Sequence, residues 1–209
     1  MLDVRKIRLT LELREAGILD YKVLSAIEKT PREIFIPENF RNQAYENISL
    51  PIGSEQTISQ PYIVALMTEA LELKKNHKVL ELGTGSGYQS AILSLLTRRV
   101  YTVERIKSLL IKAEEKFKEL KLSNIVTKYG DGNLGWVEQI PFDRVILTAA
   151  TKNISKIIID HVSDEGIIIA PIIENSKQIL KKFKKINNKI TVKALSNVLF
   201  VPNLPGVID

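Results

Sequence analysis

The sequence predicts an α/β fold: a doubly wound, mostly parallel sheet with a helical segment at the N-terminus and an antiparallel edge at the C-terminus. Three observations predict it. Between residues 77 and 172, short apolar runs alternate with helical patterns, which is typical of βαβ units whose sheet is covered on both faces. A glycine-rich turn follows the first run, and a lysine-rich hairpin pattern comes near the end of the chain.

The first sixty residues predict two helices and a connector. An amphipathic helix is suggested by the apolar residues Ile7, Leu11, Leu13 and Ile18. Residues 20–30 predict a second helix, with Asp20 as its N-cap and a stop at Thr30-Pro31. The segment 31–53 is punctuated by prolines, and we expect such a connector to lie on the surface of the domain.

The remainder of the chain predicts the sheet and its helices. Pro61 suits the first turn of a helix over 61–72. Strands are expected at 77–83, 100–104, 125–130, 142–150 and 166–172, and helices at 88–98, 106–121 and 153–163. The last strands form a hairpin that turns at Asn187-Asn188. We expect one domain over 1–209, with a helical and substrate-loop region (1–60), a cofactor-binding core (61–175) and a C-terminal hairpin and tail (176–209).

Composition excludes several kinds of site. The chain has no Cys, so it has no thiolate nucleophile and no cysteine-ligated metal. Its two histidines, His77 and His161, are far apart in the sequence and form no metal-ligand cluster with acidic residues; we therefore expect no metal site. We also expect no membrane span and no secretory signal, because the apolar runs are short and charges interrupt the N-terminus. The expected compartment is the cytoplasm.

The glycine-rich turn indicates a ligand site. Gly83, Gly85 and Gly87 follow an apolar strand and precede a helix. Glycine is needed where the backbone turns sharply or where a ligand approaches closely, and ligands bind at this end of a parallel sheet. The spacing G-x-G-x-G, with Tyr88 in the sixth position, differs from the dinucleotide fingerprint, and no Gly-Lys-Ser/Thr follows as a P-loop requires.

Acidic residues end the next two predicted strands. Glu104 lies seventeen residues after Gly87, where a carboxylate can accept hydrogen bonds from both ribose hydroxyls. Asp131 and Gly132 follow the third strand, and either the carboxylate or the neighbouring backbone can bind the amino edge of adenine. Together these positions predict a nucleoside site without phosphate chemistry.

Four short motifs and one longer stretch before them resemble a known family. "ELGTGSGY", "VYTVE", "GDG" and "FDRVILTAA" resemble the motif series of class I S-adenosylmethionine-dependent methyltransferases, which have a Rossmann-like sheet. "LPIGSEQTISQPYIVALMTEAL" closely resembles the signature that precedes these motifs in protein-L-isoaspartate O-methyltransferases. The resemblance covers roughly residues 30–173 and continues weakly into "NVLFVP".

The resemblance implies a repair reaction. The family transfers a methyl group from S-adenosylmethionine to the free α-carboxylate of L-isoaspartyl residues in damaged proteins and peptides. It implies Ser59 as the catalytic residue, with Gln60 and Val201 also at the substrate. The residues that it and the motifs place at the cofactor are Thr57, Ile58, Gly83, Thr84, Gly85, Ser86, Gly87, Glu104, Asp131 and Gly132.

The chemistry of such a reaction fits these residue types. A carboxylate with a pKa of ~3.5 is ionised at neutral pH and needs no general base. What remains is positioning, which contributes roughly 7–11 kcal/mol when two reactants are held in line. A neutral hydroxyl, such as that of Ser59, holds the anion without dulling its nucleophilicity. The alternative is that Ser59 or Thr57 only caps the helix that begins at residue 61.

The sequence departs from the family pattern at two places. Ser54-Glu55 precedes the Gln56 of the signature and brings an acid close to an anionic substrate. This weakens binding unless Glu55 points to solvent. Thr151 replaces a common proline after the fourth strand, and we expect a less rigid loop there.

Two alternatives remain from the sequence: a nucleic-acid or other small-substrate S-adenosylmethionine-dependent methyltransferase, and a non-catalytic cofactor-binding subunit. The run from Lys177 to Lys193 has seven lysines and no acid, which favours a nucleic-acid methyltransferase or, more simply, a solvated and protected sheet edge. The chain lacks the Asn/Asp-Pro-Pro-aromatic loop and the cysteine that base methylation uses, so no nucleic-acid partner is expected. A non-catalytic cofactor-binding subunit is disfavoured by the intact glycine motif and Glu104. The sequence makes no prediction of oligomeric state, peptide preference or D-aspartyl acceptance.

Overall fold

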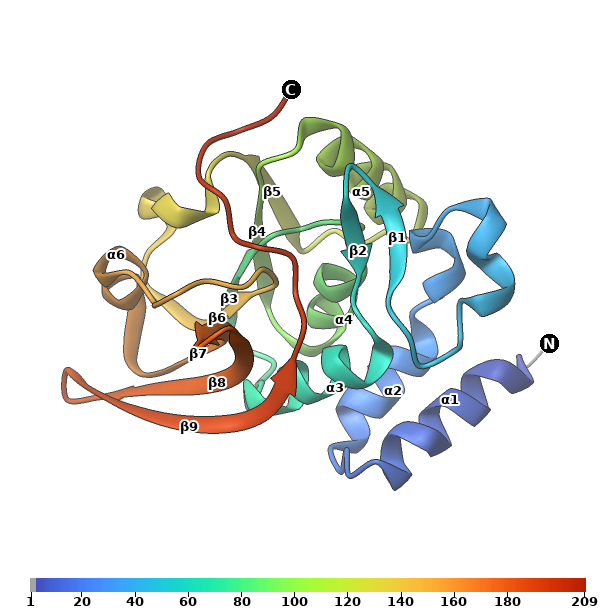
Figure 1. Cartoon of the computed structure of the whole chain (residues 1–209), viewed down its shortest axis with the longest axis horizontal. Coiled ribbons are helices and arrows are strands. Elements are labelled where there is room, and N and C mark those ends of the chain that lie inside the picture. Colours follow the sequence, from blue (N-terminus) through green and yellow to red (C-terminus); the bar gives the residue numbers. More distant parts are fainter. Residues whose placement is uncertain (1–2) are drawn as a thin grey trace.

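A seven-stranded sheet forms the centre of the computed structural model, which describes residues 3–209 (Figure 1). From one edge to the other its strands are β5 (Ile125–Tyr129), β4 (Arg99–Glu104), β3 (Lys78–Leu82), β6 (Phe142–Leu147), β7 (Val162–Glu174), β8 (Lys177–Ile186) and β9 (Lys189–Val198). The first five are parallel, whereas β8 and β9 pair antiparallel. The predicted mostly parallel sheet with an antiparallel C-terminal edge is confirmed.

Helices cover both faces of the sheet. Successive residues of a strand point to opposite faces, so Val79 and Leu80 of β3 are both fully buried but belong to different core clusters. On the Val79 side lie α3 (Pro61–Ala70), α4 (Tyr88–Leu96) and α5 (Lys107–Glu119). On the Leu80 side lies the short α6 (Lys156–Asp160). This is the doubly wound arrangement that the alternating pattern predicted.

Two N-terminal helices pack against α3 and α4 (Figure 1). Helix α1 (Val4–Glu15) ends in a Schellman motif, in which Ile18 N–H bonds to Leu13 O at 3.1 Å and Gly17 has φ +102°. Helix α2 (Tyr21–Lys29) is capped by Asp20, as predicted. The predicted apolar face of α1 was wrong at one residue: Leu11 is 53% exposed, and Leu9 is buried instead.

The connector after α2 lies partly in the core, which corrects the expectation of a surface segment. Its 3₁₀ turns span Arg32–Phe35 and Glu38–Gln43. Arg32 and Phe35 are fully buried, and the Arg32 guanidinium lies 4.9 Å from the ring centroid of Tyr88 on α4. The Phe35 ring packs edge-on against Tyr88 with the centroids 5.6 Å apart, so this segment contributes directly to the core.

The signature segment forms a β-hairpin, a feature that its polar sequence did not predict. Strand β1 (Leu50–Gly53) pairs antiparallel with β2 (Gln56–Ile58), and the turn residues Ser54 and Glu55 have φ of 49° and 57°. Positive φ at both central residues is typical of the type I′ turn, which is common in two-residue hairpins. The hairpin stands beside α3 and leads directly into it (Figure 1).

The elements after β6 differ in length from those predicted. The expected helix at 153–163 is reduced to Lys156–Asp160, because Ser155 caps its N-terminus and the chain enters β7 at Val162. The C-terminal hairpin is as predicted. Asn187 and Asn188 form its turn with φ of 49° and 61°.

Candidate functional site

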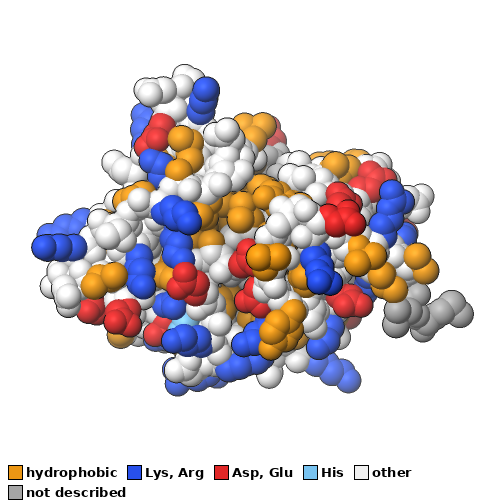
Figure 2. Space-filling model, turned by 90° about the horizontal axis from the view of Figure 1, so that it is seen from below, with side chains coloured by type: hydrophobic (Ala, Val, Ile, Leu, Met, Phe, Trp, Pro, Cys, Tyr) orange, Lys and Arg blue, Asp and Glu red, His pale blue; other side chains and the backbone are white. Residues whose placement is uncertain are grey.

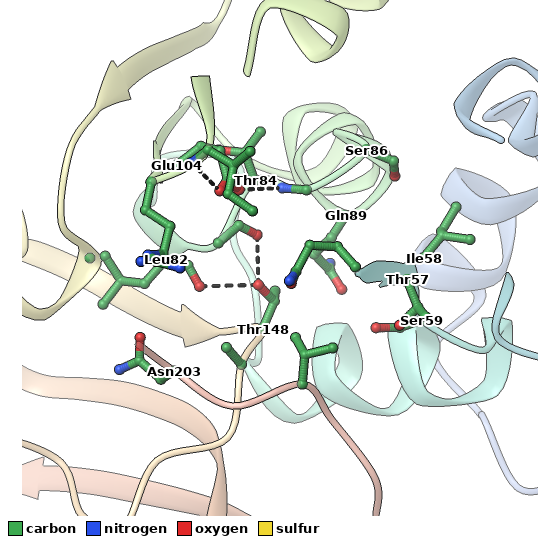
Figure 3. Close-up of a pocket in the computed structure, with 18 of the residues that line it drawn as sticks. Thr57, Ile58, Ser59, Leu82, Thr84, Ser86, Gln89, Glu104, Thr148 and Asn203 are labelled. Carbon is green, nitrogen blue, oxygen red and sulfur yellow. Dashed lines mark hydrogen bonds between the residues drawn. The ribbon is translucent and has the colours of Figure 1, made fainter. Parts of the chain in front are cut away.

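A cavity lies at the carboxyl ends of β3, β4 and β6 (Figure 3). Its floor is the glycine turn 83–86, and one end is formed by residues 103–106. The β1–β2 hairpin closes the opposite side with residues 55–59, and the C-terminal tail covers it with residues 201–204. We call this the first cavity. Its position is the one at which ligands bind in open parallel sheets.

Two glycines of the turn are required by contacts within the protein, independently of any ligand. Gly83 has φ +102°, and a Cβ there would lie 2.3 Å from Thr148 Oγ1. Gly87 has φ +89°, and its Cβ would lie 2.7 Å from the ring of Phe117 on α5. Both positions therefore exclude a side chain before any ligand is considered. Gly87 does not line the cavity, whereas Gly83, Thr84, Gly85 and Ser86 do.

Glu104 ends β4 inside the cavity and is only 5% exposed. Its Oε2 accepts from Gly85 N–H at 2.8 Å, and its Oε1 accepts from Ile106 N–H at 2.9 Å. A carboxylate offers about four acceptor sites, so two remain for ligand hydroxyls. Glu104, the residue predicted to bind ribose, is thus hydrogen-bonded directly to the glycine turn (Figure 3).

The structure places Asp131 and Gly132 differently from one another. Gly132 lines the cavity, but Asp131 does not. Asp131 Oδ1 accepts from Asn133, and its Oδ2 accepts from Gly206 N–H in the C-terminal tail at 2.7 Å. Burial raises the pKa of Asp131, but the hydrogen bonds from Gly206 and Asn133 outweigh it, and the pKa lies below its usual value. The carboxylate therefore holds the tail over the strand ends, and its contact with adenine stays a prediction.

Ser59 lies at the other side of the cavity from Glu104. It comes directly after β2, and Figure 3 shows its hydroxyl pointing inward beside Thr57 and Ile58. The capping alternative does not hold: Gln60 is the N-cap of α3 without a side-chain bond, and Asn47 Oδ1 accepts from Tyr62 N–H at 2.9 Å. The Ser59 hydroxyl is therefore not used to cap α3.

A second cavity adjoins the first behind Ser59. Gln60, Ile63 and residues 197–201 line it, and so does Ser49. Both cavities share four lining residues: Thr57, Ser59, Thr148 and Val201. All residues that line the second cavity are uncharged.

Three lining residues were not predicted as site residues. Thr148, at the end of β6, donates its hydroxyl to Leu82 O and Gly83 O at 3.0 and 2.6 Å. Gln89 of α4 donates to Thr68 of α3 at 2.9 Å. Asn203 comes from the tail, where its side chain donates to Asn133 Oδ1 at 2.7 Å. The pairing of β3 with β6 brings Thr148 to the site, the path of the tail brings Asn203, and Gln89 follows the glycine turn on α4.

The two departures from the family pattern have structural explanations. Glu55 sits at the exposed tip of the hairpin turn, at the rim of the first cavity. Thr151 N–H donates to Pro171 O at 3.0 Å, and Thr151 Oγ1 donates to Asn153 O at 3.0 Å. A proline at residue 151 has no N–H for the first bond. These two bonds hold the loop without a proline, and its lower rigidity stays a prediction.

Comparison with known proteins identifies a family. The family model of protein-L-isoaspartate(D-aspartate) O-methyltransferase (PCMT) matches residues 4–206. A protein-L-isoaspartate O-methyltransferase of Maricaulis maris is 49% identical over 204 residues, which cover 98% of this chain and 96% of that protein. Another, of Dictyoglomus turgidum, is 52% identical over 190 residues, or 91% of this chain and 86% of that protein.

Solved structures agree with the sequence comparison. A crystal structure from Plasmodium falciparum, described as a protein-L-isoaspartate O-methyltransferase in complex with S-adenosyl-L-homocysteine, superposes with a TM-score of 0.84. It is 25% identical and covers 94% of this chain and 97% of that one. The chain belongs to the protein-L-isoaspartate O-methyltransferase family, whose members are S-adenosylmethionine-dependent repair enzymes that methylate the free α-carboxylate of isoaspartyl residues.

Proposed function

We propose that methyl transfer takes place where the two cavities meet, with S-adenosylmethionine in the first and the isoaspartyl residue in the second. The observation that carries this proposal is the shared wall of Thr57, Ser59, Thr148 and Val201. A ligand in either cavity touches these residues, so the reacting groups of two ligands would meet beside them.

The first cavity fits the cofactor by its donor set. The free acceptor sites of Glu104 suit two ribose hydroxyls, and the glycine turn with Thr84 and Ser86 supplies small and polar groups around them. Gly132 offers backbone at the adenine end. When bound, the cofactor supplies a methyl group on a positively charged sulfur. Thr57 and Ile58 would then close the hairpin side against it.

The second cavity fits a peptide that carries an ionised carboxylate. Such a carboxylate has a pKa of ~3.5 and needs no proton removed before it attacks. Ser59 would donate its hydroxyl to one carboxylate oxygen and leave the other free to face the methyl group. Gln60 and the backbone at Val201 would hold the peptide on either side. Because no cation lines this cavity, the anion would keep its nucleophilicity.

We further propose that residues 1–209 work as a single domain and that the compartment is the cytoplasm. The cluster that contains α1 and α2 also contains residues of α4 and α5, which supports one folding unit. Within residues 3–209, no helix has the length and apolar character needed to span a membrane. Oligomeric state is not part of the proposal.

We propose no nucleic-acid partner for the run from Lys177 to Lys193. Lys181 pairs with Glu174, Lys182 pairs with Glu72, and Lys185 donates to Val162 O at 2.9 Å. Figure 2 shows basic side chains on this face mixed with acidic and hydrophobic ones. This supports the interpretation of a solvated sheet edge.

The reaction is tested with labelled S-adenosylmethionine and three acceptors. These are a synthetic isoaspartyl peptide, its normal aspartyl isomer and RNA. We expect methylation of the isoaspartyl peptide alone. Equal labelling of the aspartyl isomer would contradict the proposed carboxylate selection, and labelling of RNA would assign a role to the lysine run.

A further inference from the structure

A second acidic residue lies beneath the glycine turn and takes no part in the proposed reaction. Glu81 sits on β3, directly opposite Thr102 of β4 and Ile146 of β6. Its side chain is fully buried. A buried carboxyl group is costly unless it is neutral or well bonded, and Glu81 lies on an inner strand of the sheet.

Hydroxyl groups link Glu81 to the first cavity. Thr102 Oγ1 lies 2.7 Å from Glu81 Oε2, and Thr84 Oγ1 lies 2.7 Å from Thr102 Oγ1. Ser90, on α4, also bonds to Glu81 Oε2. Thr84 lines the cavity. The chain of bonds therefore ties β3, β4 and α4 together under the glycine turn.

The surroundings of Glu81 favour its neutral form. Burial raises the pKa of Glu81 to about 8; the bonds from Ser90 and Thr102 oppose the rise, and the nearby Glu104 adds to it. Glu81 Oε1 has no hydrogen-bond partner within residues 3–209. Helix α4 contributes no charged residue, and the acid of α3, Glu69, is bonded to the N–H groups of Leu19 and Asp20. Arg144 of β6, on the same face of the sheet, donates to Leu71 O at 2.5 Å, and Glu104 is the charged neighbour that raises the pKa of Glu81.

Two carboxyl groups in one site take different charges when their environments differ. Glu104 accepts two backbone N–H groups beside the cavity, whereas Glu81 receives only hydroxyl bonds in a buried site. A second negative charge would compete with the one that binds ribose.

We propose that Glu81 is a positioning residue for the cofactor: as a neutral acid it holds Thr102, and through Thr102 the Thr84 hydroxyl and the glycine turn, in the geometry that binds the nucleoside. This inference rests on the proposed use of the first cavity by the cofactor. Ligand binding removes water from around Glu104 and strengthens its repulsion of a charged Glu81. The protonated form is therefore the one that binds.

The test measures the Kd of S-adenosylhomocysteine by calorimetry from pH 6.5 to 9.5. The proteins are the wild type, Glu81→Gln and the pair Thr102→Val and Thr127→Val. Gln is neutral at every pH, so Glu81→Gln should bind within about threefold of wild type at pH 7 and should not lose affinity at alkaline pH. Wild type should lose at least about threefold relative to Glu81→Gln above pH 8. Dividing the two profiles cancels the titration of the ligand.

Thr102→Val breaks the hydroxyl chain, whereas Thr127→Val removes a strand hydroxyl that bonds to Glu114 outside the cavity. We expect Thr102→Val to weaken binding about tenfold at pH 7 and Thr127→Val to leave it unchanged. Parallel pH profiles for wild type and Glu81→Gln, or equal affinity in the two threonine variants, would overturn the inference. If Glu81→Gln fails to fold, the comparison of Thr102→Val with Thr127→Val still tests whether the hydroxyl chain supports cofactor binding. Because no peptide is used, failure of isoaspartyl methylation would not affect this result.

Discussion

The carboxylate of Glu104 accepts a hydrogen bond from the backbone N–H of Gly85 at 2.8 Å. The residue that is predicted to bind ribose therefore also fixes the turn that forms the cavity floor. The same carboxylate accepts from Ile106 N–H, which begins the approach to α5. Glu104 is therefore held in one orientation before any ligand arrives. Such preorganisation lowers the entropy that binding must overcome.

Replacing Glu104 by Ala should weaken binding of S-adenosylhomocysteine strongly. The change removes an acceptor for ribose and releases Gly85 at once, and a hydrogen bond to a charged group contributes about 1.5–3 kcal/mol. We expect Kd to rise at least about tenfold, measured by calorimetry. Glu119→Ala, at an exposed position on α5, is the matched control. Unchanged affinity in Glu104→Ala would show that the nucleoside does not bind at Glu104.

Replacing Ser59 by Ala should lower turnover and leave cofactor affinity nearly unchanged. Loss of one donor to an ionised carboxylate costs about 1.5–3 kcal/mol, which corresponds to a fall in kcat/KM for the isoaspartyl peptide of about 10- to 100-fold. Steady-state kinetics and calorimetry with S-adenosylhomocysteine provide the two readouts. Ser123→Ala, at an exposed position, serves as control. Equal loss of cofactor binding would assign Ser59 to the nucleoside.

The periodicity of the sequence predicted the sheet because the parallel strands are buried on both faces. The runs around Leu80, Val103 and Ile146 are short and mostly apolar, and they lack the 3.6-residue period of a surface helix. Asp20 and Asn187 likewise act through local backbone chemistry, which a sequence displays directly. The helix predicted at 153–163 was too long, because its isoleucines suit a helix face and a buried strand equally well and do not mark where α6 ends and β7 begins.

The site was predicted where motifs are local and missed where long-range contacts build it. Glu104 follows the glycine turn within one βαβ unit, so spacing alone places it. Thr148 reaches the turn only because β6 pairs with β3, and Asn203 only because the tail crosses the strand ends. The motif around Asp131 predicted a contact with adenine. In the structure the Asp131 carboxylate accepts a hydrogen bond from Gly206 N–H in the tail. No local pattern indicates that contact.

Glu81 should make stability depend on pH. Its pKa rises from the usual value of 4.5 to about 8 in the folded protein, so the folded state binds more protons than the unfolded state between these values. Its stabilising contribution is complete below about pH 4.5 and is lost as pH rises through about 8. The free energy of unfolding of wild type, minus that of Glu81→Gln, should fall by a few kcal/mol from pH 5 to 8.5 in urea titrations.

A difference that stays constant over this range would mean that Glu81 is ionised throughout in the folded protein. Urea midpoints must be compared at equal ionic strength, because surface ion pairs also respond to pH and salt. The matched substitution Glu119→Gln, at an exposed site, should leave the pH dependence of wild type unchanged.

Replacing Gly87 by Ala should destabilise the fold more than replacing Gly17. Both glycines have positive φ, +89° and +102°, but a Cβ at Gly87 meets the Phe117 ring at 2.7 Å, whereas nothing lies within 4 Å at Gly17. We expect about 1 kcal/mol for Gly17→Ala from backbone strain alone. Gly87→Ala adds about 1–3 kcal/mol of overpacking between α4 and α5. Urea unfolding measures both, and equal losses would show that α5 shifts freely to accommodate the methyl group.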